Sequence, residues 1–395
     1  MPERDMKIKI TELYIYPIKS LRPISVRSAQ LRREGLRHDR RFMLLRAEAD
    51  GRYTNIQVSR FPECALFAQA LDGCGHVVVT YQGEEENEEK GAPRLRVPLD
   101  PAAEDLQRNG AVDVLLFGSA ARAFRVGDEC DAWFSARLGY RAVLVYIGDN
   151  RRPVLAHAPP SSSLSSSSGS KGLSLFSYAA SFLPSYLYQQ QGRGTQEDGG
   201  EEGLAFNEAA PFLLTSRASL RDVEGRMMPN GEAVDMIKFR PNIVVDQIPS
   251  SSSSSSSSSD GIEVLGAWDE DFWGEIAIGD PAAAAQRHRH RLALTANCAR
   301  CVSIDIDYAT GRRTDVVLKR LMRDRRVDAG SKWSPIFGRY AFLLPSSAGG
   351  GSSSSNEEQG DTLSTTAAAA ADVAVGDEVE VTKRLSERDV WAWPT

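Results

Sequence analysis

The sequence has few cysteines, no long apolar run and none of the common nucleotide-binding motifs. Five cysteines in 395 residues, an odd number, argue against a secreted disulfide scaffold and favour a reducing compartment. No stretch reaches the roughly 18 to 20 apolar residues of a membrane-spanning helix. The phosphate loops GxGxxG and GxxxxGK followed by Ser or Thr are absent. A formal net charge of −6 gives no support to nucleic-acid binding. We therefore expect no transmembrane segment and no nucleic-acid partner.

Serine-rich and glycine-rich tracts divide the chain. They fill most of residues 159–203, which we interpret as a low-complexity insertion, and they recur at 249–260 and 346–370. Because such tracts bury almost no apolar surface, we predict flexible insertions there. Inside the first tract lies an aromatic segment, Leu173 to Tyr188, which is too short to span a membrane. We interpret it as a loop that docks on the protein, with peripheral membrane attachment as the alternative.

Two folded blocks remain, at residues 6–150 and 204–385. The first contains the short β-branched or aromatic runs KIKITELYIYPI, RFMLLRAE, HVVVTYQ and VDVLLFG, and a helical pattern in CDAWFSARLG. The second begins with a helix predicted over 216–226 and continues with strands in IKFRPNIVVD, WGEIAIGD, RLALTANCARCVSIDID, RYAFLLP and VAVGDEVEV. Few helices are long enough for a βαβ succession. The predicted fold class is therefore mostly β with some α, with an N-terminal β-barrel-like domain followed by a β-barrel domain.

The sharpest local motif is Asn297-Cys298-Ala299-Arg300-Cys301, a CxxC pair inside a strand-like run. Two thiols at this spacing suit half of a zinc site, a dithiol redox pair or a single metal-ligating thiolate. A zinc site would borrow His288 and His290, although that spacing is unlike a zinc finger. Two strand cysteines without a role remain the plain alternative. Arg300 favours a thiolate, since a neighbouring cation lowers the pKa of a thiol.

Basic residues gather in the run from Leu31 to Arg41. Guanidinium groups on a turn suit a phosphate because their planar fork pairs with oxyanions. A solvated loop with surface arginines is the alternative, and the shorter basic motifs YPIKS, FRPN and KRLMR are each weak alone.

The order of these motifs is more specific than any one of them. YPIKS, DRRFML, AAPFLLTSRASLRDV, KFRPNIVV, WDEDFWGEIAIGD, NCARCVSIDID, SPIFGRYAFLL and VAVGDEVEV follow one another along the chain. In this order they resemble the MOSC superfamily with its N-terminal β-barrel domain, and most closely the mitochondrial amidoxime-reducing component and its relatives. The resemblance covers nearly everything outside the serine-rich tracts.

The resemblance implies a molybdenum cofactor, in which the dithiolene of molybdopterin and one protein cysteine hold the metal. By position in the family motif this ligand and catalytic residue is Cys301, and a soft thiolate suits that metal. Cys298 would pack behind it or tune the site. The implied pterin- and phosphate-binding residues are Lys19, Ser20, Arg40, Arg240 and Asn242. Glu208 stands where relatives commonly have Asp, so its longer reach leaves its contact open.

The implied reaction is the reduction of small N-hydroxylated substrates such as amidoximes and hydroxylamines. Electrons would come from an external donor, cytochrome b5 and its reductase in similar systems, because the chain has no flavin or NAD motif. A sulfur carrier with a persulfide on Cys301, of the molybdenum cofactor sulfurase type, and a non-catalytic cofactor carrier remain alternatives. Since the N-terminus carries acids and no signal-like apolar run, we expect a cytoplasmic protein, with peripheral attachment to a mitochondrial or other membrane as the alternative. A site drawn from both blocks predicts a cleft between them.

Overall fold

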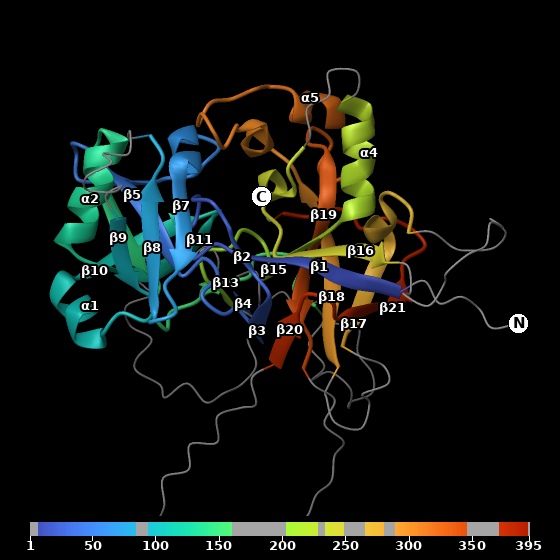
Figure 1. Ribbon diagram of the computed structural model, residues 1–395, viewed down its shortest axis with the longest axis horizontal. Coiled ribbons are helices and arrows are strands. Elements are labelled where there is room, and N and C mark those ends of the chain that lie inside the picture. The colour runs from blue at the N-terminus through green and yellow to red at the C-terminus, as the bar shows by residue number, and fades with distance from the viewer. Residues whose placement is uncertain are drawn as a thin grey trace, which may run out of the picture.

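The computed structural model describes residues 7–83, 94–159, 203–227, 234–248, 265–279, 289–345 and 371–393. The aromatic segment 173–188 and the insertions at 249–260 and 346–370 lie outside these ranges, so what the sequence predicts for them stays a prediction. Strands dominate the described residues and helices are few, which confirms the mostly β fold class. No helix in the described ranges is both long and apolar enough to cross a membrane. Two units lie side by side (Figure 1).

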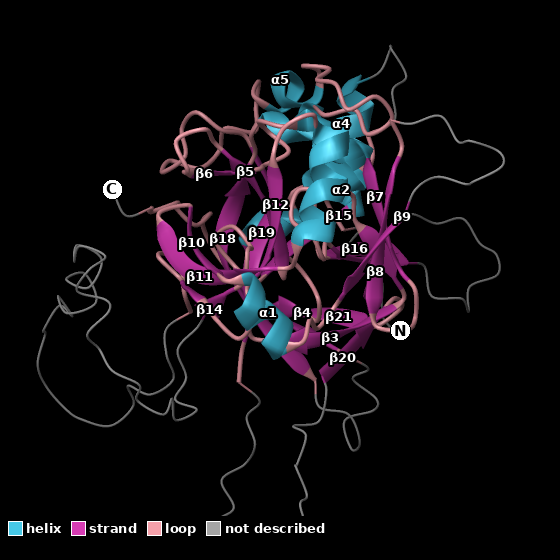
Figure 2. Cartoon of the chain, turned by 90° about the vertical axis from the view of Figure 1, so that its left-hand side faces the viewer, coloured by secondary structure: helices cyan, strands magenta, loops and turns pink. Residues whose placement is uncertain are grey.

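The second unit is a closed barrel of seven strands. Its members are β1 (Lys7–Ile15), β15 (Phe212–Ser216), β16 (Ile243–Ile248), β17 (Trp273–Ile278), β18 (His290–Ala299), β19 (Ile336–Leu343) and β21 (Glu378–Arg384). They pair around the ring in the order β16, β15, β19, β18, β17, β21 and β1, and β1 closes the ring by pairing with β16. All pairs are antiparallel except β15 with β16. The helices α4 (Arg217–Met227) and α5 (Val317–Leu321) lie beside one end of the barrel (Figures 1 and 2).

The first strand, β1, is thus part of the barrel, whose other strands all come from the second half of the chain. Ile10, Leu13 and Ile15 of β1 are buried in the barrel core. A second connection joins β20 (Ala371–Ala374) to β3 (Ser28–Arg32), which pairs in turn with β4 (Gly35–Leu36), while β2 (Ile24–Val26) pairs with β1. The block 6–150 predicted as one domain therefore gives its first strand to the other unit. Apolar alternation identifies a strand but carries no information about which sheet receives it.

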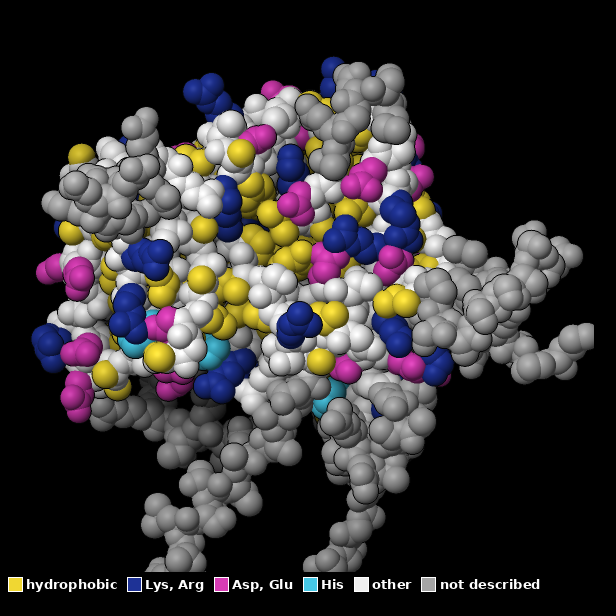
Figure 3. All heavy atoms as spheres, viewed as in Figure 1, with side chains coloured by type: hydrophobic (Ala, Val, Ile, Leu, Met, Phe, Trp, Pro, Cys, Tyr) yellow, Lys and Arg dark blue, Asp and Glu magenta, His cyan; other side chains and the backbone are white. Residues whose placement is uncertain are grey.

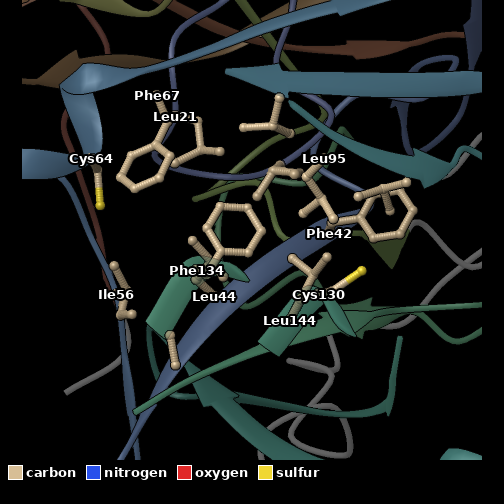
Figure 4. Packing of buried hydrophobic residues seen from close by; sticks show 14 of the residues in the cluster. Leu21, Phe42, Leu44, Ile56, Cys64, Phe67, Leu95, Cys130, Phe134 and Leu144 are labelled. Atoms are coloured by element: carbon tan, nitrogen blue, oxygen red, sulfur yellow. The ribbon is translucent and has the colours of Figure 1, made fainter. Parts of the chain in front are cut away.

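The first unit packs two sheets and two helices around its own core. Its sheets contain β5 (Phe42–Ala47), β6 (Tyr53–Asn55), β7 (Phe67–Leu71), β8 (His76–Tyr81), β9 (Arg94–Pro98), β10 (Ala111–Leu116), β11 (Ser119–Arg125) and β12 (Ala142–Tyr146), its helices are α1 (Ala103–Asn109) and α2 (Asp128–Leu138), and η1 (Pro62–Leu66) is a short 3-10 turn. One sheet runs β10, β11, β12, β5, β6 and the other β7, β8, β9. Phe42, Phe67 and Phe134 meet in the core, and Cys64 and Cys130 pack there as buried apolar groups (Figure 4).

Three strand predictions of the second block need correction. In IKFRPNIVVD the first half is the 3-10 turn η4 (Met236–Phe239), because the Asp235 side chain caps it and Pro241 has no N–H for a ladder. Strand β18 ends at Ala299, so Cys301 lies just beyond the strand and begins the 3-10 turn η7 (Val302–Asp305). In VAVGDEVEV a turn at Gly376, with φ of 102°, separates β20 from β21.

A buried ionic cluster fastens the segment after β21 to the barrel. Asp271, in the 3-10 turn η5 (Asp269–Phe272), accepts hydrogen bonds from Arg325 Nη2 at 2.7 Å and Arg388 Nε at 2.8 Å. The side chains of Asp271 and Arg325 are 0% and 5% exposed, whereas that of Arg388 is 31% exposed. Asn297 extends the contact by donating to the Asp389 carbonyl oxygen at 2.8 Å. Removal of the Asp271 carboxylate would therefore leave the buried guanidinium of Arg325 without its acidic partner.

We expect Asp271→Ala to lower the free energy of unfolding by about 3 to 5 kcal/mol, because Arg325 would keep its charge in the interior without a partner. The matched variant Arg388→Ala removes a half-exposed partner and should cost about 1 kcal/mol or less. Urea denaturation followed by tryptophan fluorescence measures both. Equal losses in the two variants would contradict the unequal burial on which this prediction rests.

Candidate functional site

One cavity of about 260 Å³ lies where the barrel meets the first unit. All seven residues that the family resemblance implies line it: Lys19, Ser20, Arg40, Glu208, Arg240, Asn242 and Cys301. They come from both blocks, as the predicted cleft requires. Other residues that line the cavity include Phe117, Phe239, Cys298, Arg300, Ser303 and Tyr340.

Most of the implied cavity residues lie in turns at the ends of strands. Lys19 and Ser20 follow β1, Arg40 lies between β4 and β5, and Arg240 and Asn242 lie between η4 and β16. Three of these residues have a left-handed backbone, with φ of 77° for Ser20, 50° for Arg40 and 54° for Arg240. Such conformations cost free energy in residues other than glycine and gather at functional sites.

Two of the arginines enclose Tyr16. The guanidinium carbon of Arg40 lies 4.5 Å from the centre of the Tyr16 ring, and that of Arg240 lies 4.4 Å from it. Arg40 is neutralised locally, because its Nη1 donates to Asp39 Oδ2 at 2.5 Å. Its Nη2 donates to the Arg240 carbonyl oxygen at 3.1 Å, and so fixes the turn that carries the second arginine.

Arg240 retains a free donor. Its Nη1 donates to the Leu21 carbonyl oxygen at 3.1 Å and to the Tyr308 hydroxyl at 3.3 Å. Its Nη2 is buried and has no hydrogen-bond partner among the described residues. An unpaired buried N–H is costly, and because Arg240 lines the cavity this nitrogen is a candidate donor for an anionic group bound there.

Ser20 and Asn242 direct their polar atoms into the protein. Ser20 Oγ donates to the Ile56 carbonyl oxygen at 2.9 Å. Asn242 Oδ1 accepts from Leu213 N and from Arg40 Nη1, both at 3.2 Å, and its Nδ2 donates to the Tyr14 carbonyl oxygen. Both side chains therefore hold the turns of the cavity together.

Lys19 and Glu208 carry opposite charges on the cavity wall. Burial, together with nearby arginines, lowers the pKa of Lys19 to about 7, although Glu208 acts in the opposite direction. The Lys19 ammonium lies 5.2 Å from the centre of the Phe117 ring. Burial alone would raise the pKa of Glu208, but Lys19 and Arg40 hold it below its usual value. Tyr340 donates a hydrogen bond to Glu208 Oε2 at 3.1 Å, so this carboxylate is ionised at neutral pH.

The two cysteines of the CxxC pair have different surroundings. Cys298 is 1% exposed, and burial raises the pKa of its thiol to about 11. Cys301 is exposed, and its Sγ lies 3.3 Å from Ser303 Oγ. Arg300 donates to the Phe239 and Phe337 carbonyl oxygens at 2.8 and 2.6 Å, and so braces the backbone beside both thiols. Only Cys301 is accessible to a ligand from solvent.

A zinc site of the kind considered from the sequence is not built by the described residues. His290 begins β18 and Cys298 lies eight residues along it, which is roughly 26 Å in an extended strand. His288 lies outside the described residues. Nowhere in the described part of the chain do three or more His, Cys, Asp or Glu side chains converge as metal ligands. The CxxC pair therefore offers one accessible soft donor, the thiol of Cys301.

The sequence analysis missed Phe117 and Tyr340 of the cavity wall, and also Arg152, which supports the wall from behind. Arg152, in β13 (Arg152–Pro153), is 1% exposed and donates to the carbonyl oxygens of Ala205 and Leu116, both at 2.9 Å. It thereby holds β14 (Gly203–Leu204) and the loop that follows in place. Tyr340 lay within the quoted motif SPIFGRYAFLL, which was a usable signal. Phe117 and Arg152 stand in unremarkable local sequence and gave none.

Comparison with known proteins agrees with this architecture. A family model described as the MOSC N-terminal beta barrel domain matches residues 7–141, and one described as the MOSC domain matches residues 201–380. The mitochondrial amidoxime-reducing component 1 of Danio rerio is 24% identical over 337 residues, which cover 84% of this chain and 79% of that protein. The mitochondrial amidoxime reducing component 2 of Rattus norvegicus is 25% identical over 341 residues, which cover 84% and 78%.

A second group of relatives is larger than this chain. A molybdenum cofactor sulfurase of Pyricularia oryzae is 25% identical over 347 residues, which cover 82% of this chain but 37% of that protein. By their names, one group reduces amidoximes and the other acts on the molybdenum cofactor. The two domain matches together cover most of the barrel and of the first unit, and they include all seven implied cavity residues. The chain belongs to the MOSC family and combines a MOSC N-terminal beta barrel domain with a MOSC domain.

Proposed function

We propose that this protein is a molybdenum-cofactor enzyme that reduces N-hydroxylated compounds with electrons from an external donor. The observation that carries the proposal is the pairing, in one cavity, of an accessible thiol at Cys301 with a cationic wall that has an unpaired donor at Arg240. The amidoxime-reducing relatives, aligned over 84% of the chain, support the substrate class.

The donor set fits the cofactor. Cys301 offers the soft sulfur ligand that molybdenum accepts. Lys19 and the buried Nη2 of Arg240 would hold the phosphate of the pterin. Arg40 would keep the turn of Arg240 in place. When bound, the cofactor supplies two-electron oxygen-atom removal.

The overall reaction converts an N–OH group to N–H. Its N–O bond breaks, two electrons and two protons are consumed, and the oxygen leaves as water. The chain contributes position and charge. The ionised carboxylate of Glu208, held by Tyr340, can orient the protonated amidine or amine portion of a substrate. The cytochrome b5 and reductase implied by the family resemblance would supply the electrons.

A second candidate function is sulfur transfer through a persulfide on Cys301. The exposure of this thiol and the sulfurase relatives favour it. The chain spans under two fifths of that relative's length, however, so a desulfurase partner would have to load the sulfur. A non-catalytic cofactor carrier would use the same residues without turnover.

We expect near-stoichiometric molybdenum and oxidised pterin in the protein purified from a cofactor-producing host, and loss of the molybdenum in Cys301→Ala. Cys298→Ala is the matched control and should retain the metal, because Cys298 is only 1% exposed and its thiol has a raised pKa. Metal analysis is followed by benzamidoxime reduction with reduced methyl viologen. Full molybdenum in Cys301→Ala would refute the ligand assignment, and metal-free protein with persulfide on Cys301 would favour sulfur transfer.

We also expect anion binding in the cavity to weaken as the pH rises. Because burial lowers the pKa of Lys19 to about 7, the lysine must take up a proton to bind an anion above that pH. For one proton, affinity should fall about 30-fold from pH 6 to 8.5. Sulfate is a suitable probe, since its own charge is constant in this range, and calorimetry on cofactor-free protein measures its binding. Lys19→Arg should remove most of the dependence, and a flat profile in the parent protein would contradict the prediction.

A further inference from the structure

The segment that joins Cys301 to β19 forms a cationic surface. Six of its exposed or half-exposed basic side chains are Arg312, Lys319, Arg320, Arg323, Arg326 and Lys332, and a seventh, Arg313, donates to the Ser59 carbonyl oxygen. None of these six makes an ion pair with a residue that the structure describes. Within 312–332 the exposed acids are Asp315 and Asp324, and Asp324 is already paired with Arg226 at 2.5 Å. This excess stands out in a chain whose net charge is −6.

An unusually exposed tryptophan lies in the same segment. Trp333 is 82% exposed, which is the largest value for a big apolar side chain in the described ranges. A solvated tryptophan buries nothing in the free protein. Tryptophan is also among the residues that most often dominate the binding free energy of protein interfaces. Its exposure beside six unpaired cations is typical of an interaction surface.

Both ends of this surface are attached next to the candidate site. At one end, η7 starts directly after Cys301, and Asp305 of η7 accepts from the first turn of α5, Leu318 N, at 2.9 Å. At the other end, Arg300 N donates to the Pro335 carbonyl oxygen at 2.8 Å. Trp333 is two residues before Pro335, so their Cα atoms are within about 7 Å. The surface therefore begins where the accessible thiol lies.

The pictures agree with this placement. In Figures 1 and 2, α5 lies at the upper edge of the molecule, whereas β3 and β4 lie near the lower edge. Dark blue Lys and Arg side chains project from that upper edge (Figure 3). An approaching molecule can contact this edge without displacing either sheet of the first unit.

We propose that this surface, residues 312–333, docks the acidic face of a redox protein that delivers electrons to the site at Cys301. The inference rests on the proposed function. It follows from charge complementarity, from Trp333 as the apolar anchor, and from the short path to the thiol. The chain has no flavin or NAD motif, so both electrons of each reduction come from such a partner, in two one-electron deliveries if it carries a single haem.

The test compares two electron sources in the cofactor-loaded protein. Cytochrome b5, an acidic haem protein, is the docking probe, and reduced methyl viologen is a small donor that needs no docking surface. The double variant Lys319→Glu with Arg323→Glu reverses the surface charge at two exposed sites, and Trp333→Ala removes the anchor. The matched control, Arg32→Glu with Arg33→Glu, reverses two exposed charges near β3 at the opposite edge.

We expect the double variant to raise the KM for cytochrome b5 about tenfold and to weaken its dependence on ionic strength. Trp333→Ala should raise the KM without changing that dependence. The viologen-driven rate should be unchanged in both, and the control should resemble the parent protein. An unchanged KM for cytochrome b5 in the double variant would overturn the docking proposal.

Direct binding separates this proposal from the proposed function. If the parent protein reduces no N-hydroxylated substrate with viologen, the proposed function fails, and calorimetric titration with cytochrome b5 then tests the surface. Binding that the double variant weakens, and the control does not, would still support docking. Binding to vesicles that contain phosphatidylserine is measured in parallel. If the double variant binds these vesicles more weakly but binds cytochrome b5 as well as the parent protein does, the surface binds a membrane and the docking proposal is overturned.

Discussion

The pairing of β1 with β16 is the constraint on which the rest of the structure depends. It joins residues 7–15 to residues 243–248 and closes a ring whose other members all come from the second half of the chain. Because β1 ends in the barrel, the chain must leave at that end to begin the first unit. The turn with Lys19 and Ser20 follows β1, and the chain passes beside this turn again at Arg40, where it enters β5 of the first unit. One backbone pairing thus brings cations from one unit against the thiol of the other.

The cavity wall contains buried cations whose charges are only partly compensated. Each buried cation there costs desolvation energy, and the protein compensates for them unequally. Arg40 has Asp39 as a direct partner, whereas Lys19 has the field of Glu208 and the face of the Phe117 ring, and Arg240 retains an unused donor. A core selected for stability alone would not keep such groups. Their presence in strained turns is consistent with a site prepared for an anionic ligand.

Much of the fold and the composition of the site could be predicted from the sequence. Alternating apolar runs predicted the strands, and ordered motifs predicted which side chains would meet, since YPIKS, FRPN and NCARC are local signals. The assignment of β1 to the barrel could not be predicted, because strand pairing over more than 200 residues leaves no local trace. The difference in burial between Cys298 and Cys301 could not be predicted from the sequence either. It depends on β18 ending at Ala299, where the register is irregular and Arg300 turns inward.

The position of Cys301 one step past the end of its strand has a consequence for how such proteins diversify. The ladder that holds β18 ends before this residue, so the exposed positions of the segment that follows can change in charge without altering the barrel. That segment determines how accessible the thiol is and which side chains surround it at the surface. A single scaffold can thereby host descendants with separate chemistries, while selection acts on the exposed positions of that segment and leaves its buried anchors, such as Leu321 and Arg325, in place.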